Sequence, residues 1–392
     1  MLGKTVKTFQ SLFSAQLIAF ICAQGLKFSV RHYLIMSAIL PRIRAINKRQ
    51  ALAPITQRFL QIDRQASFPS KILSKAKCYA ELSKFRLSSL VVFTSGAGYA
   101  LAGAPIDACT MLAACFGTAL CAASAGTFNQ IIEKDRDAMM NRTCLRPLPA
   151  GKVSVPEAGV WGVSTAALGT GLLLGATNPT VAALGAFNIF LYSVPYTYSK
   201  QHTELNTWIG SLVGAIPPVM GWAAATGGSF LAADPLAIAS ALFLWQFPHF
   251  FALSWLHRND YAKGNFQMVA VNDPQGTRSA KLIWDYSLML TALPLVTSAT
   301  GLTSWMFAVE GSVINLYLLS LAHAFKREQS NARARKVFLT SLWYLPVLLA
   351  AMVFHSRNWN EQHLEDSSRV DNKQVNECFY GYYASLFELL CI

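Results

Sequence analysis

Nine long apolar runs, separated by short polar loops, constrain the fold of this 392-residue chain more than any other feature. A helix that crosses a bilayer needs about 20 mostly apolar residues. Many of the runs also contain Gly, Ala and Ser, which let membrane helices approach one another closely. The sequence therefore predicts an all-α membrane protein with nine transmembrane helices packed in a bundle. The runs lie near residues 88–105, 109–130, 156–176, 179–197, 206–226, 233–256, 282–300, 303–324 and 337–355.

The composition agrees with this class. Charged residues make up 14% of the chain and hydrophobic residues 53%, whereas average globular usage is about 25% charged. The net charge of +13 would favour nucleic acid as a partner of a soluble protein. Here the basic residues sit in short loops, so we expect membrane lipid and anionic ligands as partners and no nucleic acid. The eight cysteines form no Cys-x-x-Cys pair, and we expect neither a disulfide framework nor a zinc site.

Lys and Arg are distributed unevenly between the two sides of the predicted bundle. We call side A the side that holds the residues before the first run. The loops after the second, fourth, sixth and eighth runs lie on side A and are rich in Lys and Arg. The opposite loops ATNPT, TGGSFLAADP and TSATGLTS lie on side B and contain no Lys or Arg. This asymmetry supports the nine spans and fixes their orientation; in a mitochondrion, side A would face the matrix.

The amino-terminal segment has the composition of a targeting sequence. Residues 1–62 contain no Asp or Glu but nine Lys and Arg residues, which is typical of a mitochondrial targeting segment that is cleaved or disordered. The apolar stretch 11–23 makes a secretory signal the alternative. We expect a mitochondrial inner-membrane protein, with an intramembrane domain over 78–355 and a polar tail over 356–392 that has no predicted role.

Three polar residues close the second run on one helix face. Asn129, Glu133 and Asp137 are spaced i, i+4, i+8, which stacks their side chains. Two carboxylates so placed would repel unless a cation lay between them. Mg²⁺ suits this position because it takes one or two carboxylates plus phosphate oxygens. The alternative is a loop whose charges are simply solvated. Further groups suited to a diphosphate follow directly: Asn141, Arg142 and Arg146.

The sixth run holds a second polar cluster. Gln246 and His249 lie inside the run, where both are candidate substrate-binding residues, and Asp260 lies just past its end. An ionisable group inside a membrane helix is a functional hypothesis by default. The alternatives are a neutral histidine hydrogen-bonded between helices, a glutamine that joins helices, and a solvated loop aspartate.

A third cluster closes the fourth run. Tyr196 and Lys200 are four residues apart and share a helix face, where they could present a phenol and an ammonium to a phosphate, whereas the neighbouring Tyr192 and Tyr198 could be interfacial anchors. All three clusters end on side A, so we expect them to meet at one cavity. Two more candidate substrate-binding residues precede the first run on that side: Lys84 and Arg86.

The strings that carry these clusters resemble those of a known family. NQIIEKDRDAMMNRTCLRPL is similar to the first signature of the UbiA-type intramembrane prenyltransferases, in the form found in the branch that acts on heme. LSKFRLSSLVVFTSGAGYALA, NTWIGSLVGAIPPVMGW, and FLWQFPHFFALSW followed by DYAKG extend the resemblance over about residues 78–325.

The resemblance implies a bundle around a cavity that opens to lipid. It also implies a Mg²⁺-bound polyprenyl diphosphate held by Asn129, Glu133 and Asp137, with Glu133, Asp137 and Asp260 as metal ligands. Helping or catalytic roles would fall to Asp260, Arg142, Arg146, Lys200 and Tyr196. One departure affects the number of metal ions. The wider family carries a second Asp-x-x-x-Asp motif, whereas here Gly264 stands four residues after Asp260.

The branch implies a specific reaction. A farnesyl group would pass from farnesyl diphosphate to a vinyl group of heme B and give heme O, a step towards heme A for cytochrome c oxidase. A downstream heme A synthase is the partner that this role suggests, and His249 is a candidate for holding the heme or positioning the water that quenches the cation. Three alternatives remain: a prenyltransferase that uses a quinone precursor, a transporter or channel, and a non-catalytic assembly subunit.

Overall fold

The computed structural model describes residues 68–103 and 105–359. The predicted targeting segment and nearly all of the tail lie outside these residues. The chain divides into two compact units, residues 1–90 and 91–392. The described part of the first unit is α4 (Phe68–Leu82) and the beginning of α5 (Phe85–Leu101).

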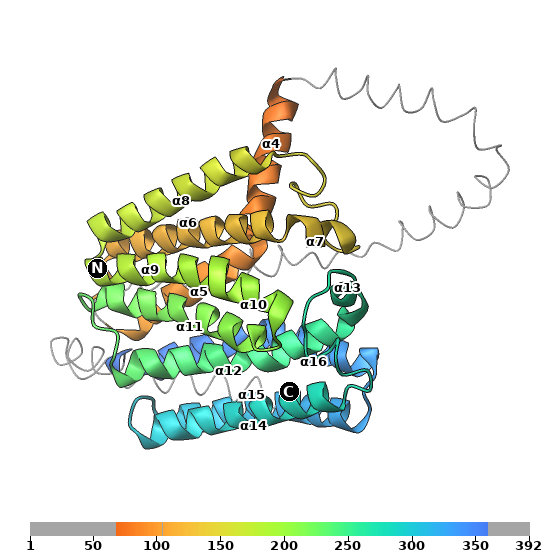
Figure 1. The fold of residues 1–392 in the computed structure, drawn as a ribbon. Helices are drawn as coiled ribbons and strands as arrows, with labels where there is room; N and C mark the ends of the chain where they lie inside the picture. Colours follow the sequence, from red (N-terminus) through yellow and green to blue (C-terminus); the bar gives the residue numbers. More distant parts are fainter. Residues whose placement is uncertain (1–67, 104, 360–392) are drawn as a thin grey trace, which may run out of the picture. The chain divides into compact units, whose positions relative to one another are not determined.

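The second unit consists of α-helices joined by short loops (Figure 1). Within the described residues its one β contact is an isolated bridge between Thr303 and Ser356, so the predicted all-α class is confirmed. After α5 the helices are α6 (Ala108–Ile132), α7 (Lys134–Met139), α8 (Val155–Ala176), α9 (Pro179–Leu191), η1 (Tyr192–Tyr196), α10 (Thr197–His202), α11 (Asn206–Ala225), α12 (Ala233–Leu256), α13 (Arg258–Lys263), α14 (Thr277–Ala299), α15 (Trp305–Arg327) and α16 (Asn331–Phe354).

Seven of the described helices are long and apolar enough to cross a membrane: α6, α8, α11, α12, α14, α15 and α16. The predicted count of nine is therefore not confirmed in full. The other two predicted runs form α5, of 17 residues, and α9, of 13 residues, which the π-helical turn η1 joins to α10. The interruption in the fourth run coincides with Pro195, which lies inside η1. Proline supplies no backbone N–H to the helical ladder, and π-turns accommodate such breaks.

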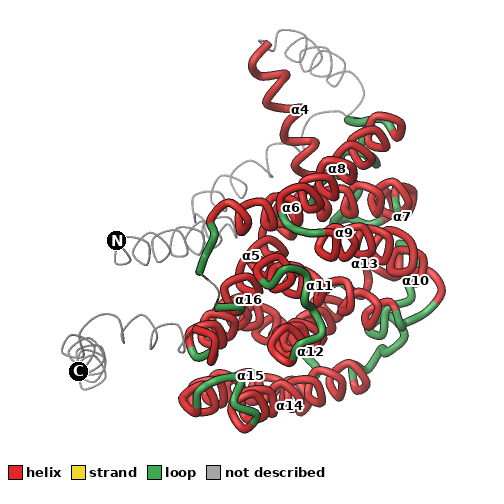
Figure 2. Tube along the Cα trace, turned by 90° about the vertical axis from the view of Figure 1, so that its left-hand side faces the viewer, coloured by secondary structure: helices red, strands yellow, loops and turns green. Residues whose placement is uncertain are grey.

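Helices that follow one another in the sequence pack as antiparallel neighbours, from α6 with α8 through to α15 with α16. Two further sets of contacts close the arrangement: α12 packs on α16, and α6 packs on both α9 and α11. Figure 2 views these helices from another side and shows α14 and α15 next to each other. We call the A end the one where α6, α12 and α15 finish, on the right of Figure 1, and the B end the one where α12 and α15 begin.

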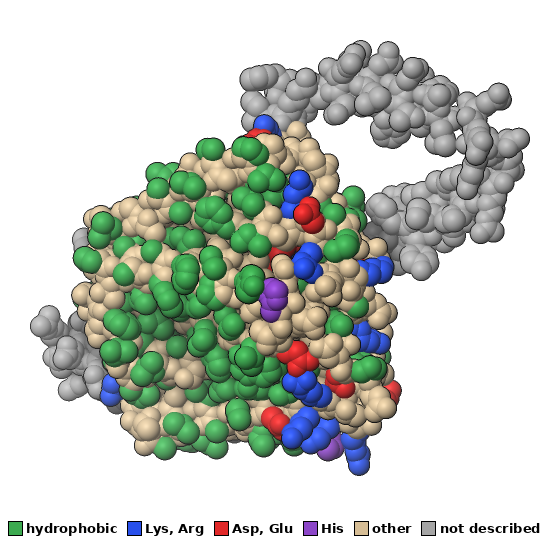
Figure 3. All heavy atoms as spheres, in the orientation of Figure 1, with side chains coloured by type: hydrophobic (Ala, Val, Ile, Leu, Met, Phe, Trp, Pro, Cys, Tyr) green, Lys and Arg blue, Asp and Glu red, His purple; other side chains and the backbone are tan. Residues whose placement is uncertain are grey.

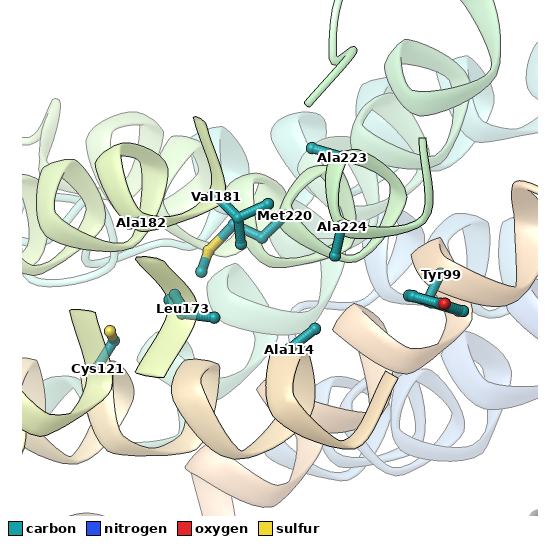
Figure 4. Close-up of a cluster of buried hydrophobic side chains, with 9 residues drawn as sticks. All are labelled: Tyr99, Ala114, Cys121, Leu173, Val181, Ala182, Met220, Ala223 and Ala224. Carbon is teal, nitrogen blue, oxygen red and sulfur yellow. The ribbon is translucent and has the colours of Figure 1, made fainter. Parts of the chain in front are cut away.

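A cluster of buried side chains joins α6, α8, α9 and α11 with the end of α5 (Figure 4). Small residues dominate the closest contacts. A Cβ at Gly221 of α11 would collide with the carbonyl oxygen of Ser95, and one at Gly98 with the carbonyl oxygen of Pro218. Such backbone proximity is how helices associate in lipid, where apolar burial gives little driving force. The cluster comprises Tyr99, Ala114, Cys121, Leu173, Val181, Ala182, Met220, Ala223 and Ala224.

The outward faces of the helices are apolar. Phe116, Leu168 and Phe190 are all more than half exposed. Figure 3 shows hydrophobic side chains over most of the visible face, with acidic and basic side chains gathered towards the A end. A surface of this kind suits lipid along the helices and polar ligands at the A end.

Candidate active site

The two central acids lie where α6 gives way to α7. Helix α6 ends at Ile132. Glu133 caps it with a ψ of 4°, which departs from the helical value, and α7 starts at Lys134 and holds Asp137. Both acids are nevertheless buried, with exposed fractions of 3% for Glu133 and 1% for Asp137. Asp135, which the helical pattern placed off their face, is exposed. The local break thus still turns both carboxylates towards the protein interior.

Each buried acid faces one base. Lys200 Nζ lies 2.9 Å from Glu133 Oε1, and Arg146 Nη1 lies 2.6 Å from Asp137 Oδ2. The carboxylates are not saturated by these contacts. Asp137 Oδ1 is buried without a hydrogen-bond partner, and Glu133 Oε1, although close to Lys200, has none in hydrogen-bond geometry. Buried carboxylate oxygens left in this state are expensive unless a ligand completes them.

Asn129 holds the π-helical turn that carries Lys200 towards Glu133. Its Nδ2 donates to Thr197 Oγ1 at 2.8 Å, and Thr197 Oγ1 donates to the carbonyl oxygen of Tyr192 at 2.8 Å. Such side-chain bonds satisfy a carbonyl where the ladder is irregular. Asn129 therefore contacts the segment that positions Lys200, and the direct role that the sequence predicted for it stays a prediction.

Lys200 is held by an aromatic wall as well as by its acid. Its Nζ lies 4.4 Å from the centroid of the Tyr196 ring and 5.8 Å from that of Phe266. Burial by itself lowers the pKa of Lys200, but the Glu133 carboxylate overcomes this and raises the pKa above its usual value. Gly210 of α11 makes room for Tyr196, because a Cβ there would lie 2.6 Å from its ring. The predicted pair Tyr196 and Lys200 thus meets as a cation–π contact.

Asp260 ties two loops together. Its Oδ1 accepts from the backbone N–H of Asn141 at 2.8 Å and its Oδ2 accepts from that of Arg142 at 3.0 Å. Arg142 Nη2 also donates to Tyr261 Oη at 3.1 Å. Partial burial raises the pKa of Asp260, but the two backbone hydrogen bonds and the charge of Lys263 outweigh it, so the pKa lies below its usual value.

The predicted metal set of Glu133, Asp137 and Asp260 is not brought together. Across the described residues, no group of three or more His, Cys, Asp or Glu side chains converges as a metal cluster. Each oxygen of Asp260 accepts one backbone N–H, which ties this carboxylate to the loop at Asn141 and Arg142. Two buried acids, each with an incompletely bonded oxygen, are what the structure offers to a cation.

The segment after α13 covers Lys200, and the sequence analysis missed it. Arg136 Nη1 donates to the carbonyl oxygens of Gly264 and Asn265 at 2.9 and 3.1 Å. The backbone N–H of Gln267 donates to the carbonyl oxygen of Lys200 at 2.7 Å. Asn265 has a φ of +53°, a left-handed conformation that asparagine tolerates. The signal that could have found this strap is the run KGN, which is typical of a tight turn.

A cavity of about 400 Å³ opens beside Asp260 at the A end. The predicted residues Asn141 and Arg142 line it, as do three polar residues that sequence reasoning did not single out as site residues. These three cluster in the string HRNDYAK at the end of a membrane helix, which was the available signal. They are His257, Asn259 and Lys263.

Gln246 and His249 occupy the α12 interior. Gln246 Nε2 donates to the carbonyl oxygen of Ser211 in α11 at 3.0 Å, which joins the two helices, and to that of Leu242 in its own helix at 3.1 Å. His249 Nδ1 lies 2.8 Å from Ser341 Oγ of α16. Their assignment to substrate binding stays a prediction. The same holds for Lys84 and Arg86, which belong to the other unit of the chain.

Comparisons with known proteins place the chain in a family. The sequence profile of the UbiA prenyltransferase family matches residues 90–355. The chain is 41% identical over 305 residues to a protein of Arabidopsis thaliana named protoheme IX farnesyltransferase, mitochondrial, with 77% of this chain and 70% of that protein covered. It is 41% identical to the human protein of the same name, with 70% of this chain and 61% of the human protein covered.

Solved structures share the fold. A structure of digeranylgeranylglyceryl phosphate synthase aligns with a TM-score of 0.61 at 15% identity and covers 73% of this chain and 99% of its own. A UbiA homolog from Aeropyrum pernix K1 aligns with a TM-score of 0.55 at 17% identity, covering 67% and 96%. A UbiA homolog from Archaeoglobus fulgidus, solved with DMAPP and Mg²⁺, aligns with a TM-score of 0.51 at 16% identity, covering 70% and 98%.

The fold and the paired acids and bases define an all-helical membrane protein with a polar site at one end of its bundle. The family match covers well over half of the chain, and the relatives exceed 30% identity over most of it. The chain belongs to the UbiA prenyltransferase family, as its sequence strings indicated.

Proposed function

We propose that this protein transfers the farnesyl group of farnesyl diphosphate to a vinyl group of heme B and so makes heme O. The observation that carries the proposal is the pair of buried, incompletely bonded acids, Glu133 and Asp137, each facing one base at the A end. The acceptor is assigned from the relatives at 41% identity, whose name specifies protoheme IX and a farnesyl group.

The acids fit a Mg²⁺–diphosphate group. Asp137 Oδ1 is a buried hard oxygen without a partner, and Glu133 lies one helical turn away. Mg²⁺ typically binds one or two protein carboxylates and completes its shell with water and substrate phosphates. Glu133 and Asp137 would hold the ion, which supplies charge neutralisation to the diphosphate as the C–O bond breaks.

Lys200 and Arg146 are placed to stabilise the negative charge that develops on the leaving diphosphate. In the present structure each base is paired with an acid. If the acids held a cation, Arg146 and Lys200 would be released from their pairs to bind diphosphate oxygens. Arg146 can bind two oxygens at once, and Lys200 acts as a point charge. Cationic donors in a water-poor site stabilise the charge that develops in a transition state far more than donors in water do.

The surrounding side chains keep water away from the allylic cation. Tyr196 and Phe266 wall the ammonium of Lys200, and Phe266 is itself only 2% exposed. The strap at residues 264–267 is tied to Arg136 and to the backbone of Lys200. A closed apolar wall of this kind limits premature hydrolysis of a reactive intermediate.

The setting follows from the same relatives. We propose that the protein lies in the mitochondrial inner membrane with the A end towards the matrix, because the side-A loops carry most of the Lys and Arg residues and the relatives are named mitochondrial. A heme A synthase would take its product. A transporter is disfavoured because Glu133, Asp137 and Lys200 lie at helix ends, whereas transporters bind near the membrane midplane.

Product analysis tests the proposal. The full chain, purified in detergent, is supplied with heme B, farnesyl diphosphate and Mg²⁺, and heme O is followed by chromatography and mass. We expect heme O from the wild type and a loss of about 10²–10³-fold for Asp137→Asn. The Asp135→Asn variant is the matched control, since Asp135 is exposed on the same short helix. Farnesylation of a quinone precursor in place of heme would move the assignment to another acceptor.

A further inference from the structure

His249 is an ionisable group inside a membrane-spanning helix that the proposed diphosphate chemistry does not use. It lies in α12 and is only partly accessible. Its ring stacks on Trp245 with centroids 4.8 Å apart, and the ring of Phe338 of α16 lies 5.1 Å away. Two aromatic neighbours therefore restrict the orientation of the imidazole.

The hydrogen bonds around Ser341 decide which ring nitrogen carries the proton. Ser341 Oγ donates its single hydrogen to the carbonyl oxygen of Phe338 at 2.6 Å. The same Oγ lies 2.8 Å from His249 Nδ1. Because the hydroxyl hydrogen is already used, Oγ must accept in the second bond, and Nδ1 must carry the hydrogen. A neutral imidazole protonated at Nδ1 has its lone pair on Nε2.

Nε2 has no hydrogen-bond partner among the described residues, and the ring neighbours are aromatic. A metal ion needs only the lone pair. Histidines that bind metals characteristically donate their other N–H to a fixed oxygen, which sets the tautomer and the ring angle. The geometry around His249 has this form.

The backbone of Ser341 is fixed from the other side. Trp245 Nε1 donates to the carbonyl oxygen of Ser341 at 2.8 Å, and Ser341 is fully buried. One residue of α12 thus holds Ser341 in place, while Ser341 orients another residue of α12 one turn further along. This arrangement exceeds what a simple link between α12 and α16 would need.

We propose that Ser341 is a positioning residue that holds His249 in its Nδ1–H form, so that Nε2 binds the iron of the heme substrate as an axial ligand. The inference rests on the proposed function for the identity of the substrate. The step forms one coordinate bond from the Nε2 lone pair to iron, with no change of oxidation state and no proton released.

Heme titration of the full protein in detergent tests the proposal, with ferric heme as the probe and absorption and electron paramagnetic resonance spectra as readouts. We expect an imidazole-ligated spectrum for the wild type that His249→Gly abolishes and that added imidazole restores. We expect Ser341→Ala to weaken heme binding about 10-fold, within the 10–100-fold range for partners of metal-binding histidines, and to make ligation more dependent on pH.

The control is Tyr344→Phe. Tyr344 Oη donates to Asn315 Oδ1 at 2.5 Å between α16 and α15, so the variant removes a buried bond of the same helix without touching His249. It should leave the heme spectrum unchanged. The proposal would be overturned if the His249→Gly and Ser341→Ala variants both fold and both keep the wild-type heme spectrum, even if heme O is made. Intact His249-dependent ligation without heme O formation would instead contradict the proposed function alone.

Discussion

The two ends of the bundle differ in how completely their polar side chains are hydrogen-bonded. At the B end Asp234 is fully used: its Oδ2 accepts from Arg357 Nη2 at 2.8 Å and its Oδ1 accepts from Asn358 Nδ2 at 3.0 Å. At the A end Asp137 is just as buried but accepts from Arg146 at one oxygen and leaves the other without a partner.

Histidines repeat the contrast. His355 at the B end has both ring nitrogens bonded, Nδ1 to Ser304 Oγ at 2.9 Å and Nε2 to Glu310 Oε2 at 3.1 Å. His249, in the part of the bundle towards the A end, has only Nδ1 bonded. Complete pairing indicates groups that hold the fold together, whereas incomplete pairing of buried or partly buried groups indicates a place for a ligand.

The largest expected effect is on catalysis at the A end. Glu133→Gln removes a charge from the proposed cation site and leaves the buried ammonium of Lys200 without its acid. We expect heme O formation to fall by about 10²–10³-fold, and thermal stability to fall as well because an unpaired buried charge is costly. Initial rates and thermal unfolding of the same sample measure both. Near wild-type rates would remove Glu133 from the site.

The second prediction concerns stability at the B end. Asp234→Ala breaks two hydrogen bonds at a nearly buried carboxylate and should lower the free energy of unfolding by about 1–3 kcal/mol. Catalytic rate per folded molecule should stay within about twofold, because the proposed cation and diphosphate site lies at the other end. Unfolding monitored by circular dichroism, with activity normalised to folded protein, checks both parts. A selective loss of rate would break the contrast between the two ends.

The third prediction uses the lowered pKa of Asp260. A carboxyl group with a depressed pKa in the folded state stabilises that state above its unfolded pKa and loses the contribution as pH falls through the folded pKa. The tether to Asn141 and Arg142 should therefore persist at pH 5 and weaken only below the usual range for aspartate. Hydrogen exchange of the amides of Asn141 and Arg142 against pH reports it. Loss of protection already near pH 6 would contradict the assignment.

The smallest effect is expected at an exposed ion pair of the A end. Arg333 Nε lies 3.5 Å from Glu328 Oε2, with exposed side-chain fractions of 42% and 63%. Pairs of this kind contribute about 0–1 kcal/mol. Glu328→Ala should leave both unfolding and heme O formation within error. A clear effect would show that charge at the A end acts through more than its buried members.

Much of the site followed from sequence because helical spacing is a local property. The spacing of Asn129, Glu133 and Asp137 placed them on one face, and the structure buries all three. What could not be read locally was pairing across the bundle: Lys200 with Glu133, Asn129 with Thr197, and the strap over Lys200. These contacts depend on how α6, α10 and the α13 loop pack.

Two features of the structure depend on backbone geometry that the sequence did not reveal: the break in the fourth span and the hydrogen bonds of Asp260. The length of the apolar run predicted one continuous fourth span. In the structure a π-helical turn that contains Pro195 interrupts it, and the apolar pattern alone gives no sign of this turn. The metal-binding role of Asp260 stays a prediction, and nothing in the sequence indicated its hydrogen bonds from the backbone amides of Asn141 and Arg142. Every residue except proline has a backbone N–H, so composition gives no sign of which of these donors a carboxylate will meet.

Binding of farnesyl diphosphate, measured by calorimetry with and without Mg²⁺, tests the central claim most directly. The samples are the wild type, Asp137→Asn from the A end and Asp234→Asn from the B end, a matched pair of buried aspartates. The account predicts Mg²⁺-dependent binding by the wild type and by Asp234→Asn, and at least about a tenfold loss of affinity together with loss of the Mg²⁺ dependence for Asp137→Asn. Equal binding by the two variants would contradict it.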